Sequence, residues 1–349
     1  MPPLDADARR RHYKRRDAAS AYRSQVSVAV LGVAVRHNRA VPTLRADEVA
    51  AWCARWLGSP PARVLFATGA LSSVTGLRLG DGRDVVVKVR PYASRLQGCA
   101  AVHRALWTAG FACPEPLVDV RQLNGFAISA EALVPNVDEP PPDSELATLS
   151  AAALARLVDL APHATNLAPS PSWTGWDHDE PGLWPTPENR DVDLNTVAAS
   201  KWLDRVAAAV RDRLRDHACN LVVGHGDWHP ENLRWKGREL VAVHDWDSVI
   251  RQPEAAIAGF AAVSFCGLEK PAPHADIAAF LDAYQQARGR RWSADEYAVG
   301  WAAGLWQRAF DAKVRSLDGD PEQVLTRDQA RSRLSLSGLD PDLVADGSP

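Results

Sequence analysis

The sequence predicts an α+β protein with two lobes, a small β-rich lobe followed by a larger, mainly helical one. Its 349 residues are more than a single compact core usually contains, which favours two lobes. Short runs rich in β-branched residues fill the chain from 64 to 133, and helical spacing of apolar residues dominates after 144. A proline-rich segment at 135–143 separates the two patterns. The expected parts are an N-terminal extension, partly disordered, at 1–44, a first lobe at 45–134, a second lobe at 135–335 and a frayed tail at 336–349.

The first lobe is expected to begin with a helix and to continue as a sheet with one inserted helix. Val49, Trp52 and Trp56 recur at helical spacing, and Gly58 follows as a stop signal. Asp81-Gly82, between two β-branched runs, indicates a hairpin. The expected order is helix, three strands, helix and two strands, at 45–57, 64–67, 74–79, 85–89, 95–109, 117–120 and 126–133.

The second lobe is expected to be mostly helical around a long loop. Apolar periodicity predicts helices at 144–160, 195–217, 253–265, 274–288 and 294–316. Residues 163–192 have the composition of a loop and contain Trp173, Trp176 and Trp184.

Composition and charge exclude several classes of protein. Lys plus Arg number 40 and Asp plus Glu number 43, so the basic surplus typical of nucleic-acid binders is missing and no nucleic-acid partner is expected. The basic cluster at 9–16 is expected to be a solvated tail rather than an arm for RNA or membrane. The apolar stretch 26–35 is shorter than a membrane span, and no cleavage-site pattern follows it, so we expect no membrane partner and a cytoplasmic location. The five scattered cysteines predict free thiols rather than a zinc or disulfide framework.

The strongest functional signal lies in residues 222–247. One apolar run ends in His-Gly-Asp-Trp-His-Pro-Glu-Asn at 225–232, and a second ends in His-Asp-Trp-Asp at 244–247. Phosphoryl transfer to a hydroxyl needs a carboxylate to orient the attacking oxygen, oxygen ligands for magnesium and a lysine for the phosphates. The two segments supply the carboxylate and the metal ligands.

The order and spacing of these residues match a known loop. His225, Asp227 and Asn232 follow the H-x-D-x-x-x-x-N pattern of the protein-kinase catalytic loop, and Asp245 follows where a second metal-binding aspartate is expected. The two segments together resemble the aminoglycoside phosphotransferase and choline kinase family. The resemblance runs from about Val64 to Phe265 and is specific only across the loop and the acidic strand end. It implies a two-lobed, protein-kinase-like fold and a magnesium-dependent phosphotransferase that moves the γ-phosphoryl group of ATP (or GTP) to a hydroxyl of a small molecule.

The same resemblance implies a role for each matching residue. Asp227 would be the catalytic base, and Asn232 and Asp245 would bind magnesium. Asp247 would assist the metal, directly or through another ligand, and His225 would brace the loop by hydrogen bonding. Residues 129–134 would form the hinge that meets the nucleotide base with backbone groups.

Lys88 is the expected phosphate-binding lysine. It interrupts an apolar run at 84–90, which resembles the Val-Ala-Ile-Lys strand of kinases. A lysine is rarely buried without a partner, and nucleotide phosphates would supply one. Strand alternation also allows the plainer interpretation, in which Lys88 shares a solvent-facing side with Val86 and Arg90.

The phosphate-binding turn is less distinct. Residues 68–76 lack the G-x-G-x-x-G pattern of kinases. Gly69, Ser72 and Ser73 are the expected nucleotide-binding residues there, through backbone N–H groups and hydroxyls. An ordinary turn between strands would have the same composition.

One departure from the family pattern raises an alternative function. Kinases pair the strand lysine with a glutamate on the following helix, but residues 95–109 contain no acid. The glutamate position falls near Gln97 or Cys99, and Glu115 and Glu131 are other candidates for the partner. A nucleotide-binding protein with weak or lost catalysis is therefore an alternative.

A zinc hydrolase is a second alternative. His225, Asp227 and His229 could ligate zinc. Gly226 and Pro230 oppose the helix that would bring the two histidines together.

The acceptor is not fixed by the sequence. No clear excess of acids follows residue 260, so a polycation is not required, and antibiotic, sugar and amino-alcohol acceptors are all compatible. Tryptophan faces bind sugars and quaternary amines, which makes the loop with Trp173, Trp176 and Trp184 a candidate lid. Trp301 and Trp306 are expected in the core.

Overall fold

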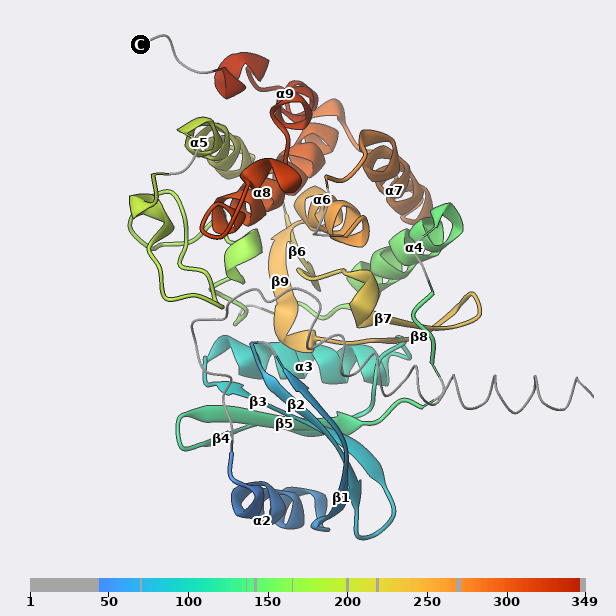
Figure 1. Ribbon diagram of the computed structural model, residues 1–349. Helices are drawn as coiled ribbons and strands as arrows, with labels where there is room; N and C mark the ends of the chain where they lie inside the picture. Colours follow the sequence, from blue (N-terminus) through green and yellow to red (C-terminus); the bar gives the residue numbers. More distant parts are fainter. Residues whose placement is uncertain are drawn as a thin grey trace, which may run out of the picture.

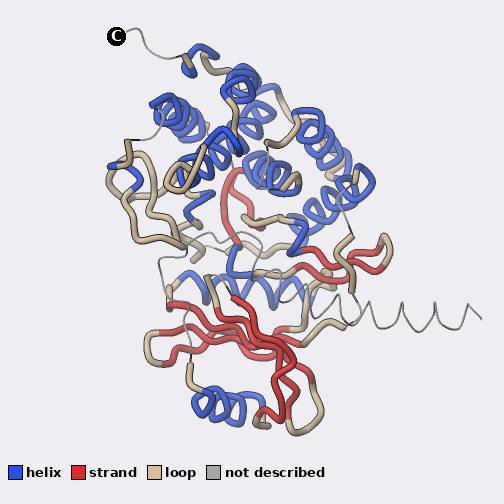
Figure 2. Tube along the Cα trace, viewed as in Figure 1, coloured by secondary structure: helices blue, strands red, loops and turns tan. Residues whose placement is uncertain are grey.

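The computed structural model describes residues 44–345, except 70, 136, 141–142, 165, 199–200, 218–219 and 268–270. The expected extension at 1–44 lies outside the described residues apart from Leu44. In the described part, the five-stranded sheet lies in one lobe and most of the helices lie in the other (Figure 2). The expected two-lobed α+β fold is confirmed.

The N-lobe is a five-stranded antiparallel sheet with the order β1-β2-β3-β5-β4. Helix α2 lies on one face of the sheet, and α3 lies between the sheet and the C-lobe (Figure 1). The elements are α2 (Ala46–Leu57), β1 (Pro61–Gly69), β2 (Ser73–Leu79), β3 (Asp84–Pro91), α3 (Arg95–Thr108), β4 (Pro116–Leu123) and β5 (Phe126–Ala132).

Successive side chains of β3 point to opposite faces of the sheet, and the two faces have different surroundings. Val85, Val87 and Val89 are buried in the core that α2 closes. Val86, Lys88 and Arg90 point to the opposite face. That face is turned toward the C-lobe rather than toward bulk water, so the solvent-facing interpretation of Lys88 is wrong.

The C-lobe contains two small antiparallel pairs of strands, β6–β9 and β7–β8, beneath packed helices. Its strands are β6 (Leu221–His225), β7 (Leu233–Lys236), β8 (Glu239–Val243) and β9 (Val249–Pro253). Its helices are α4 (Ser144–Leu160), α5 (Lys201–Arg215), α6 (Glu254–Phe265), α7 (His274–Ala287), α8 (Ala294–Arg315) and α9 (Arg327–Leu336). Short 3-10 helices lie at Ser172–Thr174, Leu194–Thr196, Pro230–Asn232, Trp246–Ser248, Pro321–Gln323 and Pro341–Val344.

A second core joins the lobes. Cys99, Val102 and Leu106 of α3 belong to the same buried cluster as the helices of the C-lobe. Helix α3 therefore packs as part of the C-lobe core although it lies between strands of the sheet in sequence, and it joins the sheet to the polar segments of 225–248.

Two expectations at the C-lobe need correction. The helix expected at 195–217 is shorter, because Asp193 caps Asn195 with its carboxylate and starts a separate 3-10 turn before α5. Within the tail expected to fray at 336–349, Pro341–Val344 form a 3-10 helix with Val344 fully buried, and residues 346–349 lie outside the described residues. Helix α9 had not been expected at all.

No described helix combines the length and apolar character needed to cross a membrane.

Candidate active site

Lys88 meets the two acids at the end of β8. Its Nζ donates to Asp245 Oδ1 and lies 2.5 Å from Asp247 Oδ1. These contacts join residues 157 and 159 positions apart along the chain. The N-lobe lysine and the acidic segment of the C-lobe thus form one site, as the sequence spacing predicts.

The loop after β6 brings the other two polar groups to the same place. Asn232 Nδ2 donates to Asp227 Oδ2 at 2.8 Å and to the Asp227 carbonyl at 2.9 Å. His225 is fully buried beneath the loop, where its Nδ1 accepts from the Asp227 backbone N–H at 3.2 Å and its Nε2 donates to the His244 carbonyl at 3.0 Å. Both nitrogens of His225 are therefore occupied, and neither faces a metal. This geometry removes the support for a zinc site on this histidine.

Buried indoles support the loop from below. Trp228 is fully buried and meets His225 edge to face at 5.8 Å between ring centroids. Trp246 meets His225 in the same way at 5.6 Å and stacks on His103. The loop and the acidic segment are therefore fixed to one rigid aromatic base.

Asp245 has an unusual backbone conformation. Its φ of 66° and ψ of 46° lie in the left-handed region, which costs a residue with a side chain some strain and is often retained at functional sites. Ser248 compensates by donating its hydroxyl to Asp245 Oδ2 at 3.0 Å and its backbone N–H to the Asp245 carbonyl at 2.9 Å. The turn aims the Asp245 carboxylate at Lys88.

The electrostatics separate the acids into two kinds. Burial, together with the negative charge of Asp245, raises the pKa of Asp227 to about 7. Burial also acts to raise the pKa of Asp247, but Lys88 and Arg90 outweigh it and hold that pKa well below its usual range. Burial lowers the pKa of His225 to about 4, so its ring stays neutral. Asp227 is thus suited to exchange a proton near neutral pH, whereas Asp247 stays charged.

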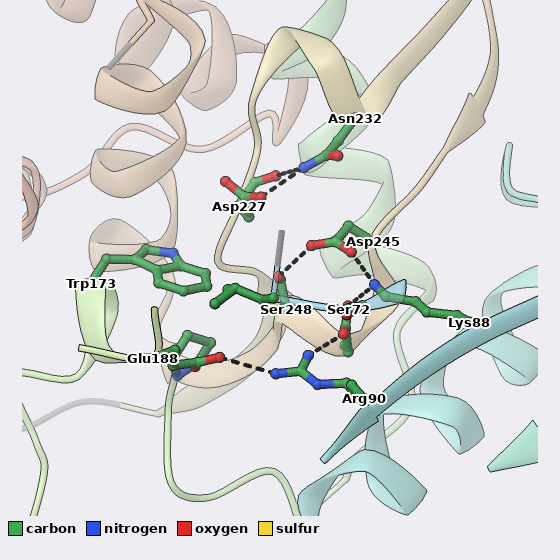
Figure 3. A pocket seen from close by; sticks show the side chains of 12 residues that line it. Ser72, Lys88, Arg90, Trp173, Glu188, Asp227, Asn232, Asp245 and Ser248 are labelled. Atoms are coloured by element: carbon green, nitrogen blue, oxygen red, sulfur yellow. Dashed lines mark hydrogen bonds and ion pairs between the residues drawn. The ribbon is translucent and has the colours of Figure 1, made fainter. Parts of the chain in front are cut away.

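The carboxylates of Asp227, Asp245 and Asp247 line a cavity of about 280 Å³ between the lobes. In Figure 3, Lys88 and Arg90 enter from one side, and Asp227 and Asn232 lie across from them. The lining residues are Leu71, Ser72, Lys88, Arg90, Pro171, Trp173, Glu188, Asp227, Asn232, Asp245, Asp247 and Ser248.

The expected phosphate turn contributes only in part. Ser72 lines the cavity. Gly69 and Ser73 pair with each other at the base of the turn and do not line it. A Cβ at Gly69 would lie 2.3 Å from the Ser72 carbonyl oxygen, so glycine is required for the chain to turn this tightly.

The residues fit magnesium through their chemistry. Asp245 and Asp247 offer carboxylate oxygens, and Asn232 offers its amide oxygen, since its nitrogen is directed at Asp227. Magnesium is usually held by one or two carboxylates together with substrate phosphates. No group of three or more His, Cys, Asp and Glu side chains within the described ranges could hold a metal ion by itself. Two carboxylates and one amide oxygen are donors of the kind that would hold magnesium together with substrate phosphates.

Comparison with known proteins decides the family. A sequence model described as the phosphotransferase enzyme family matches residues 64–293. The chain belongs to this family. No curated protein sequence matches the chain.

Solved structures share the kinase-like fold of the phosphotransferase family at low identity. An amicoumacin kinase in complex with AMP-PNP, Ca²⁺ and Ami is 11% identical, with a TM-score of 0.56 over 82% of this chain and 89% of its own. A spectinomycin phosphotransferase in complex with ADP and spectinomycin is 11% identical, with a TM-score of 0.52 over 87% and 97%. A thermostable mutant of an aminoglycoside phosphotransferase is 15% identical, with a TM-score of 0.50 over 86% and 99%.

The structure also answers the question of the missing helix acid. Gln97 is exposed and Cys99 is buried, so neither replaces the glutamate beside Lys88. Helix α3 instead presents Arg95, which donates to the carbonyls of Asp247 at 2.6 Å, Val249 at 2.5 Å and Leu167 at 3.2 Å. In this phosphotransferase the helix is tied to the backbone of the acidic segment rather than to the lysine.

Among the acids considered as partners of Lys88, Glu131 comes nearest to replacing the missing helix glutamate. It pairs with Val86 across β3 and β5, so it shares the face of the sheet that carries Lys88. Its carboxylate is 3.1 Å from His244 Nδ1, in the residue directly before Asp245. Burial acts to raise the pKa of Glu131, but His244, His103 and Lys88 together hold it below its usual value.

Three polar or charged lining residues were not expected from the sequence: Arg90, Glu188 and Ser248. Arg90 donates to Asp247 Oδ2, and its Nη2 is 3.0 Å from Glu188 Oε2. Of the three tryptophans in the candidate lid, only Trp173 lines the cavity. Trp176 and Trp184 are buried and donate to Gln252 and Asp204, so they belong to the core and not to a lid.

Proposed function

We propose that this protein transfers the γ-phosphoryl group of a nucleoside triphosphate, together with magnesium, to a hydroxyl of a small molecule. One observation carries the proposal. A strand lysine, a loop aspartate with its asparagine and a pair of acids, contributed by two lobes, line the same cavity. This is the set of groups that phosphoryl transfer needs.

Asp227 is the base in this proposal. Its raised pKa suits it to accept the proton of the acceptor hydroxyl. As that proton moves to the carboxylate, a bond forms between the acceptor oxygen and the γ-phosphorus. The bond from the γ-phosphorus to the bridging oxygen breaks, and the nucleoside diphosphate leaves.

The other residues bind and orient. Lys88 holds phosphate oxygens, and Asn232 orients the Asp227 carboxylate while its own oxygen, with Asp245 and Asp247, is available to the metal. Bound magnesium neutralises charge on the phosphate oxygens.

The acceptor side of the cavity favours a molecule with a flat or methylated apolar part. Trp173 lines the cavity and is fixed by its Nε1, which donates to the Gly226 carbonyl at 2.8 Å, next to Asp227. Such a ring can pack on a sugar, an antibiotic ring or an alkylated amine. Antibiotic, sugar and amino-alcohol acceptors remain the classes to test.

The first test is binding, followed by turnover. The melting temperature of the protein would be measured with ATP and GTP, each with and without magnesium, because selective binding to the native state raises it. Turnover would then be measured as label transferred from γ-labelled nucleotide across a panel of acceptors, with Asp227→Asn as the inactive control. Nucleotide binding without transfer to any acceptor would favour the alternative of a binding protein, and no binding of either nucleotide would overturn the proposal.

A further inference from the structure

Arg90 is a second cation in the cavity, and none of the roles above uses it. It lies two residues after Lys88 on β3 and so faces the same way. Its side chain is 18% exposed, and its guanidinium bridges Asp247 and Glu188. It is neither a surface residue nor a fully buried structural one.

The positive side chains of the cavity are paired with its carboxylates, and the binding of a metal and a nucleotide would alter these pairs. In the present structure Lys88 and Arg90 are both bound to acids that can also serve as metal ligands. A divalent cation held by Asp245 and Asp247 would compete for these carboxylate oxygens and repel both positive side chains. A triphosphate bound with the metal would offer them new acceptors. Arg90 would then be free to leave Asp247 for phosphate oxygens.

The register of the sheet indicates which phosphate Arg90 meets. Val85 pairs with Ala132 in the expected hinge, Lys88 pairs with Ser129, and Arg90 pairs with Ala127. Arg90 thus lies roughly 7 Å beyond Lys88 along the strand, away from the hinge. There it faces Glu188 of the segment that also carries Trp173, on the acceptor side of the cavity.

We propose that Arg90 is a second phosphate-binding residue, which contacts the terminal phosphoryl group while Glu188 holds its guanidinium in place. The proposal rests on the proposed function, since it assumes a nucleoside triphosphate in this cavity. A guanidinium is well suited to this task because it presents several fixed donors to phosphate oxygens. Arg95, the other nearby arginine, cannot take this part, because its guanidinium is held by three backbone carbonyls.

The test compares a triphosphate with a diphosphate. Affinities of the whole protein for a non-hydrolysable ATP analogue and for ADP, both with magnesium, would be measured calorimetrically for wild type and Arg90→Gln. We expect Arg90→Gln to lower the affinity for the triphosphate by roughly 10- to 100-fold, the cost of losing a charge-assisted hydrogen bond. The affinity for ADP should change far less. Arg90→Lys should recover part of the loss, and Glu188→Gln should lower the triphosphate affinity by a smaller factor than Arg90→Gln.

Arg78→Gln is the matched control. Arg78 lies on the neighbouring strand β2 and forms an ion pair with Asp84 at 2.6 Å, outside the cavity. It should leave both affinities unchanged. If Arg90→Gln lowered both affinities equally, or neither, the assignment to the terminal phosphate would be overturned while the proposed function stood. If the wild type bound neither nucleotide, the proposed function itself would fail.

Discussion

Asn232 holds Asp227 by two hydrogen bonds from a single amide nitrogen, one to the carboxylate and one to the backbone carbonyl. The bond to Oδ2 opposes the rise in pKa that burial and Asp245 impose on Asp227. Asp227, held in this way, lines the cavity. One side chain thus sets the orientation of the proposed base and moderates its basicity.

Replacing that base should greatly slow phosphoryl transfer but leave the affinity for the nucleotide unchanged. We expect Asp227→Asn to lower kcat by roughly 100- to 10,000-fold, the usual contribution of a positioned base. The affinity for magnesium-nucleotide should stay close to that of wild type, because Asp227 is not a nucleotide ligand. Asp119→Asn, which removes a partly exposed carboxylate paired with Arg104, is the control. Full turnover in Asp227→Asn would show that another group is the base.

Asp245 should govern the metal dependence. In Asp245→Asn, one metal-binding oxygen is lost, so the magnesium concentration for half-maximal activity should rise by roughly tenfold or more. A titration of initial rate against magnesium at saturating nucleotide would measure it. If the dependence of the rate on magnesium were unchanged, Asp245 would not be a metal ligand.

Substitutions at Trp173 should change the binding of the acceptor and not that of the nucleotide. Removing its ring in Trp173→Ala should raise the acceptor KM by roughly tenfold, the value of one aromatic contact. Trp173→Phe keeps an aromatic ring but loses the hydrogen bond to the Gly226 carbonyl, so its acceptor KM should lie between those of wild type and Trp173→Ala. Trp107→Ala, which removes an exposed indole from α3, is the control. A change in nucleotide affinity without a change in acceptor KM would contradict this assignment.

Arg95 should matter for stability. Arg95→Met leaves three carbonyl oxygens without their donor, and we expect the free energy of unfolding to fall by about 2–4 kcal/mol. Arg104→Met, on the same helix but partly exposed, should change it by less than about 1 kcal/mol. Denaturant unfolding of both variants would measure the difference, and equal stability would refute the anchoring role.

Asp311, which is in α8 and is not among the residues that line the cavity, should make the stability of the protein depend on pH. Burial raises its pKa from 3.8 to about 6, with Arg308 opposing the rise. Because the folded-state pKa is the higher one, this group contributes stability below about pH 4 and loses it as pH rises through about 6. Asp311→Asn lacks this titration, so its free energy of unfolding relative to wild type should rise by at most about 3 kcal/mol between pH 4 and pH 8.

The matched variant for this measurement is Asp328→Asn, at an exposed carboxylate. Unfolding curves at several pH values should show no comparable trend for it. A constant stability difference between Asp311→Asn and wild type across this range would mean that Asp311 does not titrate differently in the folded state.

The sequence predicted best what depends on local spacing. The loop at 225–232, the acids at 245 and 247, and the single lysine in an apolar strand all follow from residues close together in the chain, and the structure brings them into one cavity. Most helices and strands were placed within a few residues for the same reason. Their roles in catalysis stay predictions until the variants are measured.

What the sequence missed depends on contacts between distant segments. Arg90 and Glu188 are 98 positions apart, and neither stands out from its neighbours until the fold brings them together. The long loop was expected to carry a lid of three tryptophans, yet two of them are buried by partners on α5 and β9. Composition cannot tell a buried indole from an exposed one when its partner is supplied by tertiary structure.

The anchoring of α3 through Arg95 has a consequence for control. Protein kinases switch by swinging the corresponding helix, which makes or breaks the lysine–glutamate pair. Here α3 is held to the main chain of the acidic segment by the Arg95 guanidinium, which donates to the carbonyls of Asp247 and Val249. We therefore expect α3 to keep its position relative to the acidic segment whether or not Lys88 is paired.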